Sequence, residues 1–215
     1  MNTRRDACRN LRIDYRLDSF DYRLDGAKKK PIDTAVIFGR EAPLVMEIGC
    51  GKGQFICEYA RRHPEKNIIA VECVAGILVE ACERVMENGI ENIRFMEMKA
   101  EYLPLFIKEN SVEKIFLNFS TPYPKSKHES HRLTSPGFLE IYRSLLRSGG
   151  SVIQKTDSEP FFDYSLESFK NGGFEIQSVC RDLKSGDCDN IVTEYEQKFR
   201  DLGMPIFRLE AIKRD

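Results

Sequence analysis

Residues 44–53 read Leu-Val-Met-Glu-Ile-Gly-Cys-Gly-Lys-Gly, a short apolar run followed at once by a glycine-rich turn. The apolar run is typical of a buried strand. Gly49, Gly51 and Gly53 let the backbone turn tightly and approach a ligand, because no Cβ atom stands in the way. A strand that ends in such a turn and leads into a helix predicts an α/β fold.

The rest of the chain continues this alternation of strands and helices. The expected strands cover residues 44–48, 68–72, 93–97, 114–119, 151–156, 174–179 and 205–212. The expected helices cover residues 53–62, 75–88, 101–108, 135–147, 159–170 and 192–202. Alternation of this kind predicts a mostly parallel sheet with helices on both faces.

The length of 215 residues suits a single domain, which we assign to residues 41–215. Residues 1–40 show no clear period and are expected to form an arm. Residues 1–30 carry nine Lys and Arg against five Asp, a net charge of +4, whereas the whole chain has a net charge of −1. A basic arm can contact phosphates, although a frayed and solvated terminus is the alternative.

The composition argues against several classes of protein. The apolar runs are far shorter than the roughly 20 residues of a membrane-spanning helix. The N-terminus is rich in Arg and has no apolar core, so it is not a secretory signal. Seven cysteines are scattered without a CxxC pair, which disfavours a zinc site and favours reduced thiols. We therefore expect a cytoplasmic protein without a metal site or membrane association.

The second strand ends in an acidic residue that suggests the ligand. Glu72 lies 19 residues after Gly53, and a carboxylate there can accept both hydroxyls of a ribose. A dinucleotide site expects GxGxxG, whereas this turn is GxGxG with Glu47 two residues before its first glycine. That carboxylate suits an ammonium and would repel a pyrophosphate. The pattern favours S-adenosylmethionine over a dinucleotide, and a glycine-rich turn without a ligand remains the alternative.

Four further motifs point to a family. Residues 117–133 read LNFSTPYPKSKHESHRL and match the pattern N-F-[PS]-D-P-W-P-K-x-x-H-x-x-R-R-L at eight positions. The matched residues are Asn118, Phe119, Pro122, Pro124, Lys125, His128, Arg132 and Leu133. Later matches are K-T-D at residues 155–157, T-x-[FY]-E at residues 193–196 and G-x-P-[IV] at residues 203–206. With these motifs in order, the chain resembles the bacterial tRNA (guanine-N(7)-)-methyltransferases from about residue 36 to its end.

The resemblance implies a Rossmann-like methyltransferase fold and transfer of a methyl group from S-adenosylmethionine to the 7-nitrogen of a guanine in the tRNA variable loop. It implies a cofactor site made by Glu47, Gly49, Gly51, Gly53, Glu72, Lys99, Asn118 and Thr121. It implies substrate contacts by Lys125, Asp157, Thr193 and Glu196, with Thr121 and Asp157 at the catalytic positions. For tRNA binding we expect the basic arm and the loop that carries Lys125, Lys127, His128 and Arg132.

Simpler interpretations of these residues remain open. Asp157 follows a strand and could cap the next helix. Glu196 could be one more solvated charge on a helix. Lys125 and its neighbours could form an ordinary exposed loop. The oligomeric state, monomer or homodimer, is also open.

Three departures from the family pattern matter, at Thr121, Tyr123 and Lys99; Tyr123 replaces a Trp and keeps an aromatic surface. The motif D-P-W-P is replaced here by residues 121–124, Thr-Pro-Tyr-Pro, which removes the presumed catalytic Asp. Lys99 stands where an Asp would meet the adenine amino group, and a lysine cannot accept that hydrogen bond. Glu97 or Glu101 could substitute for it. The sequence thus predicts an active methyltransferase with a weakened site; the main alternative is a catalytically degenerate relative that binds tRNA or the cofactor.

Overall fold

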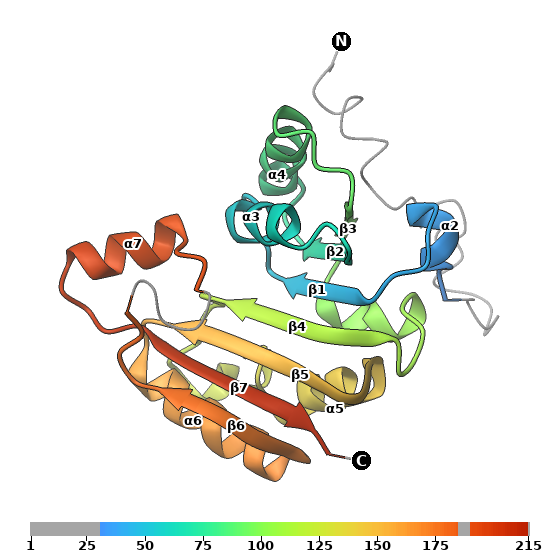
Figure 1. The fold of residues 1–215 in the computed structure, drawn as a ribbon. Coiled ribbons are helices and arrows are strands. Elements are labelled where there is room, and N and C mark those ends of the chain that lie inside the picture. The colour runs from blue at the N-terminus through green and yellow to red at the C-terminus, as the bar shows by residue number, and fades with distance from the viewer. Residues whose placement is uncertain (1–30, 185–189, 215) are drawn as a thin grey trace.

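The computed structural model describes residues 31–184 and 190–214 of the chain. Seven strands form one sheet in the order β3-β2-β1-β4-β5-β7-β6, in which only β7 runs antiparallel to its neighbours (Figure 1). The strands are β1 (Leu44–Ile48), β2 (Asn67–Glu72), β3 (Ile93–Glu97), β4 (Val112–Asn118), β5 (Leu146–Thr156), β6 (Phe174–Cys180) and β7 (Phe207–Lys213). The predicted mostly parallel sheet is therefore confirmed.

Helices cover both faces of this sheet. They are α2 (Thr34–Phe38), α3 (Gln54–Arg62), α4 (Ala75–Glu87), α5 (Pro136–Leu145), α6 (Glu159–Asn171) and α7 (Glu194–Asp201), with short 3-10 helices η3 (Ala100–Leu105) and η4 (Ser126–His131). α3 and α4 lie on one face, and α5 and α6 lie on the other (Figure 1). Among the described residues, no helix has both the length and the apolar character needed to span a bilayer.

The sheet separates two apolar cores because alternate residues of a buried strand point to opposite faces. In β1, Val45 packs into the core under α3 and α4, whereas Met46 packs into the core under α5 and α6. All five residues of β1 are buried, as expected for a strand covered on both sides. The one charged residue among them, Glu47, therefore needs an explanation, which the next subsection gives.

Residues 31–40, which the sequence assigned to the arm, pack against the domain. α2 begins at Asp33, whose side chain accepts from two backbone amides of the first turn. The Ile32 amide donates to the Phe106 carbonyl at 2.7 Å, and Phe38 packs on the core beneath the Arg94 guanidinium. The basic residues of the predicted arm, residues 1–30, lie outside the described part of the chain, so the boundary at residue 40 stays a prediction.

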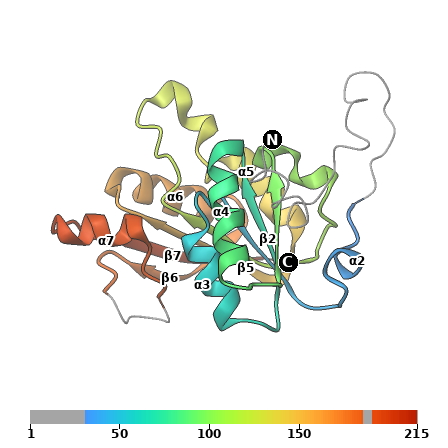
Figure 2. The ribbon, with the colours of Figure 1, turned by 90° about the horizontal axis from the view of Figure 1, so that it is seen from above.

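Different helices lie at the two ends of the molecule that the strand termini define. Viewed along a direction 90° away, α7 lies at one end of the molecule and α2 at the other (Figure 2). The arrowheads of β1, β4 and β5 point towards the end that carries α7 (Figure 1). The loops at the carboxyl ends of these strands and α7 therefore share one end of the molecule.

Candidate functional site

The carboxyl ends of β1 and β4 meet at a topological break in the sheet. The two strands are adjacent, but the chain continues from β1 to β2 on one side and from β4 to β5 on the other. Ligands of open α/β sheets bind at such a break. The strand register sets four polar side chains there on the face covered by α3 and α4: Glu47, Glu72, Asn118 and Lys155.

The turn after β1 needs its glycines for two different reasons. Gly49, Gly51 and Gly53 have φ angles of 78°, 54° and 74°, a region that side chains with a Cβ rarely adopt. At Gly53 a Cβ atom would also lie 2.9 Å from the Cβ of Ala81 on α4. Gly53 thus allows α3 to start against α4, while the amides of Gly49 and Gly51 tie the turn to the end of β2, donating to the Val71 carbonyl at 2.8 Å and to Glu72 Oε2 at 3.1 Å.

Glu72 is held by the backbone around it. One carboxylate oxygen accepts from the Gly51 amide at 3.1 Å, and the other accepts from the Val74 amide at 2.9 Å. The side chain is 8% exposed. Each carboxylate oxygen can accept a further hydrogen bond. The arrangement fixes two acceptors beside the glycine turn, which is the geometry that a pair of ribose hydroxyls requires.

Glu47 is buried with one oxygen unsatisfied. Its Oε1 accepts from Asn118 Nδ2 at 2.8 Å, while Glu47 Oε2 and Asn118 Oδ1 have no hydrogen-bond partner among the described residues. Burial raises the pKa of this carboxyl to about 8. Unpaired buried acceptors are costly, so a donor is missing from this place. An ammonium group would satisfy both oxygens and restore the carboxylate charge, which fits the amino-acid end of S-adenosylmethionine.

The loop after β4 is rigid and strained. Phe119 and Tyr123 have positive φ angles of 51° and 43°, uncommon for aromatic residues. The Arg132 guanidinium donates to the carbonyls of Pro122 and Tyr123 at 3.1–3.3 Å and stacks over the Tyr164 ring. The loop's own carbonyls thus engage the Arg132 side chain, and its expected contact with a tRNA phosphate stays a prediction.

Thr121 and Lys125 lie on the exposed part of this loop. Thr121 follows the end of β4 by three residues, as the motif requires, and supplies a hydroxyl in place of a carboxylate. Lys99 is exposed as well and precedes η3. Both positions are exposed, so burial does not compensate for either departure from the family pattern.

A buried ion pair joins β5 to α7. Lys155 Nζ lies 2.8 Å from Glu196 Oε2, with side-chain exposures of 3% and 0%. The same ammonium donates to the Ile191 carbonyl at 2.8 Å and to Asn190 Oδ1 at 3.1 Å. Glu196 Oε1 accepts from Asn190 and from Arg200, both at 2.6 Å. Since Glu196 is fully buried, its interpretation as a solvated helix charge is wrong.

Two other predicted residues take definite places. Thr193 caps α7, and its hydroxyl accepts from the Glu196 amide at 3.0 Å. Asp157 does not cap α6, since Ser158 holds the cap position, so the capping interpretation is wrong. Asp157 instead lies half-buried directly beyond the end of β5. The structure thus brings Asp157 and Glu196 to the same end of the sheet as Glu47 and Asn118.

The sequence interpretation gave no role to Lys155, although it lies in the K-T-D motif. A lysine inside a strand that is otherwise buried was the available signal, because such a charge needs a partner. No sequence pattern marked the neighbouring residues Asn190 and Arg200 as parts of the site. They are brought to Lys155 and Glu196 only by the folding of distant segments.

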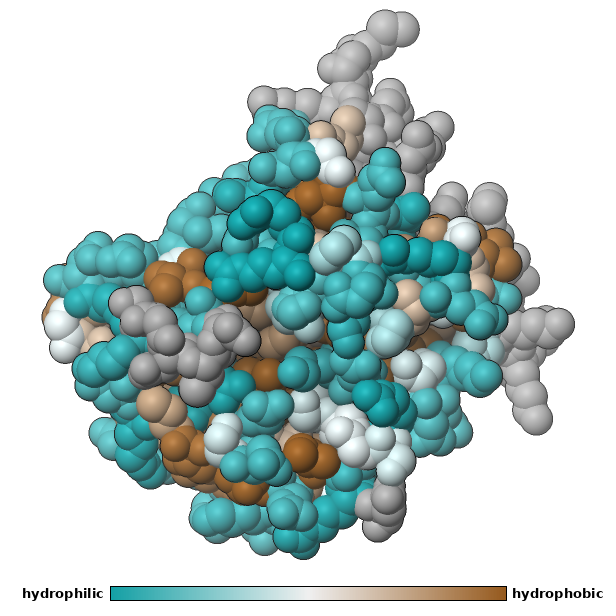
Figure 3. Space-filling view, in the orientation of Figure 1, coloured by the Kyte–Doolittle hydropathy of each residue, from teal (hydrophilic) through white to brown (hydrophobic). Residues whose placement is uncertain are grey.

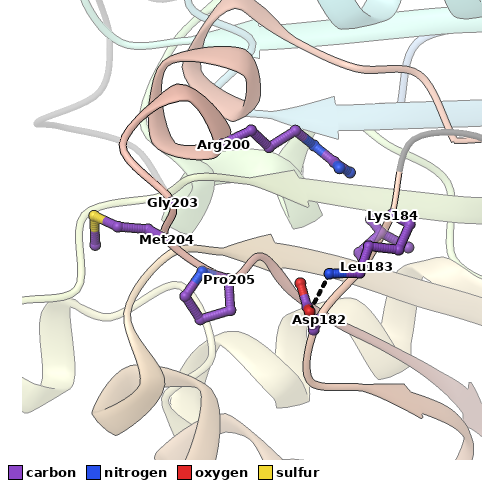
Figure 4. A pocket seen from close by; sticks show the side chains of 7 residues that line it. All are labelled: Asp182, Leu183, Lys184, Arg200, Gly203, Met204 and Pro205. Carbon is purple, nitrogen blue, oxygen red and sulfur yellow. Dashed lines mark hydrogen bonds and ion pairs between the residues drawn. The ribbon is translucent and has the colours of Figure 1, made fainter.

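The surface of the described residues carries scattered apolar patches and a hollow away from this site. On the face of Figure 3 the apolar residues form small separated patches within a hydrophilic surface. A hollow of about 310 Å3 lies beside Arg200, and Asp182 and Lys184 form an ion pair at its edge (Figure 4). It is also lined by Leu183, Gly203, Met204 and Pro205, and it contains none of the predicted site residues.

Comparison with solved structures supports the fold. KamB, a 16S rRNA methyltransferase, superimposes with a TM-score of 0.68 at 15% identity, covering 86% of this chain and 95% of that one. A 16S rRNA (adenine(1408)-N(1))-methyltransferase from Catenulisporales acidiphilia, solved with its cosubstrate SAM, gives a TM-score of 0.64 at 16% identity and covers 88% and 96%. The predicted Rossmann-like methyltransferase fold is confirmed.

Sequence comparison identifies the family. A family described as "Putative methyltransferase" matches residues 41–209. The tRNA (guanine-N(7)-)-methyltransferase of Geobacillus kaustophilus is 43% identical over 178 residues, which is 82% of each chain. That of Halalkalibacterium halodurans is 43% identical over 175 residues, 81% of this chain and 80% of its own. The resemblance found in the motifs is confirmed: this chain belongs to the tRNA (guanine-N(7)-)-methyltransferase family.

Proposed function

We propose that this protein transfers a methyl group from S-adenosylmethionine to the 7-nitrogen of a guanine in the variable loop of tRNA. The observation that carries the proposal is the pair of unpartnered buried oxygens on Glu47 and Asn118, beside the fixed carboxylate of Glu72. An ammonium on the first pair and ribose hydroxyls on Glu72 account for every unsatisfied acceptor of this group. The tRNA substrate supports the expected cytoplasmic localisation.

The chemistry requires little proton transfer from the protein. The 7-nitrogen of guanine has a free lone pair and no proton to lose, so no general base is needed. The bound cofactor supplies an electrophilic methyl group on a sulfonium. The protein therefore contributes positioning and electrostatic stabilisation, which together can provide most of the acceleration. Positive charge develops on the guanine ring, and a nearby carboxylate stabilises it.

Asp157 and Glu196 are the carboxylates available for that role. Asp157 lies half-buried at the end of β5, directly after the strand that carries Lys155. We assign substrate contacts to Asp157, Thr193 and Glu196, and an exposed phosphate or base contact to Lys125. Glu196 is paired with both Lys155 and Arg200, so this buried group has no net negative charge and Asp157 is the stronger candidate for the electrostatic role.

A catalytically degenerate relative is the second candidate, because residue 121 is a threonine. A hydroxyl offers a hydrogen bond but no full charge at the position where the family pattern has an Asp. Lys99 adds a second substitution at the cofactor's adenine end. Both candidates share the cofactor site and differ in turnover.

The decisive test is a methyl-transfer assay on unmodified tRNA, with reductive cleavage at 7-methylguanosine to locate the product. We expect label from the methyl donor to enter tRNA and the chain to be cleaved at one guanine of the variable loop. Methylation at another base would contradict the assigned substrate. Cofactor binding without methylation would favour the degenerate relative.

A further inference from the structure

Three aromatic rings cluster at the carboxyl end of β4, and we call them the aromatic platform: Phe119, Tyr195 and Phe199. The Phe119 ring stacks at 6.1 Å from Tyr195 and at 6.2 Å from Phe199, measured between ring centroids. Tyr195 and Phe199 are themselves 6.1 Å apart. The platform therefore joins the loop after β4 to one side of α7.

The outer ring of the platform is open to solvent. Tyr195 is 62% exposed, although a ring of this size gains stability from burial. Glu196 is the only residue of α7 that is buried, so α7 is anchored by the ion pair with Lys155 rather than by an apolar face. The Tyr195 ring is thus left uncovered by the helix packing, whereas Phe119 and Phe199 are half-buried beside the polar anchor.

The inner ring of the platform is held in a strained conformation. Phe119 has a φ of 51°, and its amide donates to the Lys155 carbonyl at 2.8 Å. Such strain persists where the surrounding structure enforces it, and it clusters at functional sites. Phe119 directly follows Asn118, which bonds Glu47, so the strain turns an aromatic ring to the edge of the proposed cofactor site.

We propose that the aromatic platform is the stacking surface for the base of the guanine that is methylated. The inference rests on the proposed function, which makes an RNA base the second substrate. Proteins that recognise single-stranded RNA loops splay bases out and stack them on aromatic side chains. Lys155 Nζ lies 5.9 Å from the Phe119 ring centroid, so a buried cation polarises the platform from beneath. Tyr195 also lies in the same T-x-[FY]-E motif as Thr193 and Glu196, the two residues assigned to the guanine.

Three variants separate stacking from folding. Tyr195→Leu keeps apolar bulk but removes the π face, and Tyr195→Phe keeps the π face. Leu202→Ala is the matched control, because Leu202 is 65% exposed at the end of the same helix. We expect Tyr195→Leu to lower kcat/KM for tRNA by roughly 10- to 100-fold, the range expected for one stacked base. Tyr195→Phe should restore it, and the affinity for S-adenosylmethionine should stay unchanged in all three.

A photo-crosslink locates the base directly. Unmodified tRNA carrying 6-thioguanosine at the methylated position should crosslink to Tyr195 or Phe119, as mapped by mass spectrometry. A crosslink that forms only when the thio-base occupies a neighbouring position would overturn the assignment to the target guanine. Equal kcat/KM in Tyr195→Leu and wild type would overturn the platform while leaving the proposed function intact. A wild-type protein that methylates no tRNA would instead contradict the proposed function itself.

Discussion

Glu47 at the end of β1 and Lys155 at the end of β5 are both buried ionisable groups on the same face of the sheet, but only Lys155 has a full set of partners. Lys155 makes three hydrogen bonds, one of them to a carboxylate. Glu47 makes one, and its second oxygen has none among the described residues. Lys155 therefore stabilises the fold through its partners, whereas Glu47 is available to bind a ligand.

The cofactor side and the acceptor side of the site differ in a similar way. On the cofactor side, backbone amides and glycines fix the acceptors in place. On the acceptor side, α7 is anchored to the sheet through one ion pair, and Thr121 lies exposed on a strained loop. Replacing Glu47 and replacing Lys155 should therefore change the free energy of unfolding in opposite directions.

The largest effect should come from the pH dependence of Glu47. Burial raises the folded-state pKa to about 8, well above its value in an unfolded chain. A raised carboxyl pKa stabilises the fold while the group is protonated, and this contribution is lost as pH rises from about 4.5 to about 8. The loss is at most about 5 kcal/mol over that window. Urea unfolding of wild type and Glu47→Gln across this range checks it, because the variant should lack most of the decline.

Lys155→Met should destabilise the protein by about 3 kcal/mol at neutral pH, since it leaves Glu196 buried with Arg200 as its remaining cationic partner. The matched control is Lys170→Met, which removes an exposed ion pair to Glu167 and should cost less than about 1 kcal/mol. Thermal unfolding measures both. Equal costs would show that burial does not distinguish these pairs.

Glu72→Ala should weaken S-adenosylmethionine binding by about 1–3 kcal/mol, because ribose hydroxyls lose their acceptor. Glu87→Ala serves as the control, since Glu87 is exposed at the far end of α4. Calorimetric titration gives both affinities. Tighter binding of NADH than of S-adenosylmethionine would contradict the assignment of the whole glycine turn.

The smallest effect concerns the predicted arm. Deleting residues 1–30 removes a net charge of +4 and should flatten the dependence of tRNA affinity on salt. For each tRNA phosphate that the arm neutralises, the deletion should reduce the slope of log K against log salt by about 0.7–0.9. Filter binding at several salt concentrations measures this slope. An unchanged slope would assign phosphate binding to the described domain alone.

The strands and the glycine turn on the cofactor side were predictable because their determinants are local. The apolar run, the glycines and Glu72 lie within 29 residues, from Leu44 to Glu72, and each strand carries its own pattern. α2 was not predicted, since five residues give too little periodicity to distinguish a helix from an arm. β5 begins at Leu146 rather than at residue 151, because pairing with β4 extends it through Gly149 and Gly150.

The acceptor side was less predictable because it depends on distant contacts. Lys155 and Glu196 are 41 residues apart, and no periodic pattern connects them. The motif located Thr193 and Glu196 correctly as a unit but did not reveal that one caps a helix while the other is fully buried. The sequence likewise did not indicate that Arg132 would donate hydrogen bonds to the Pro122 and Tyr123 carbonyls of its own loop.

Residue 121 is expected to limit the rate of methyl transfer, because it supplies a hydroxyl where the family pattern has a carboxylate. Single-turnover methyl transfer to unmodified tRNA, with saturating S-adenosylmethionine, compares wild type with Thr121→Asp most directly. A restored carboxylate should raise the rate by up to about 100- to 1000-fold, the effect of one preorganised electrostatic partner. Cofactor affinity is measured in parallel for both proteins, so that a change in binding is distinguished from a change in the methyl-transfer step. A wild-type rate that is already normal for an enzyme, with no gain in Thr121→Asp, would contradict the claim and assign the electrostatic role to Asp157 or Glu196.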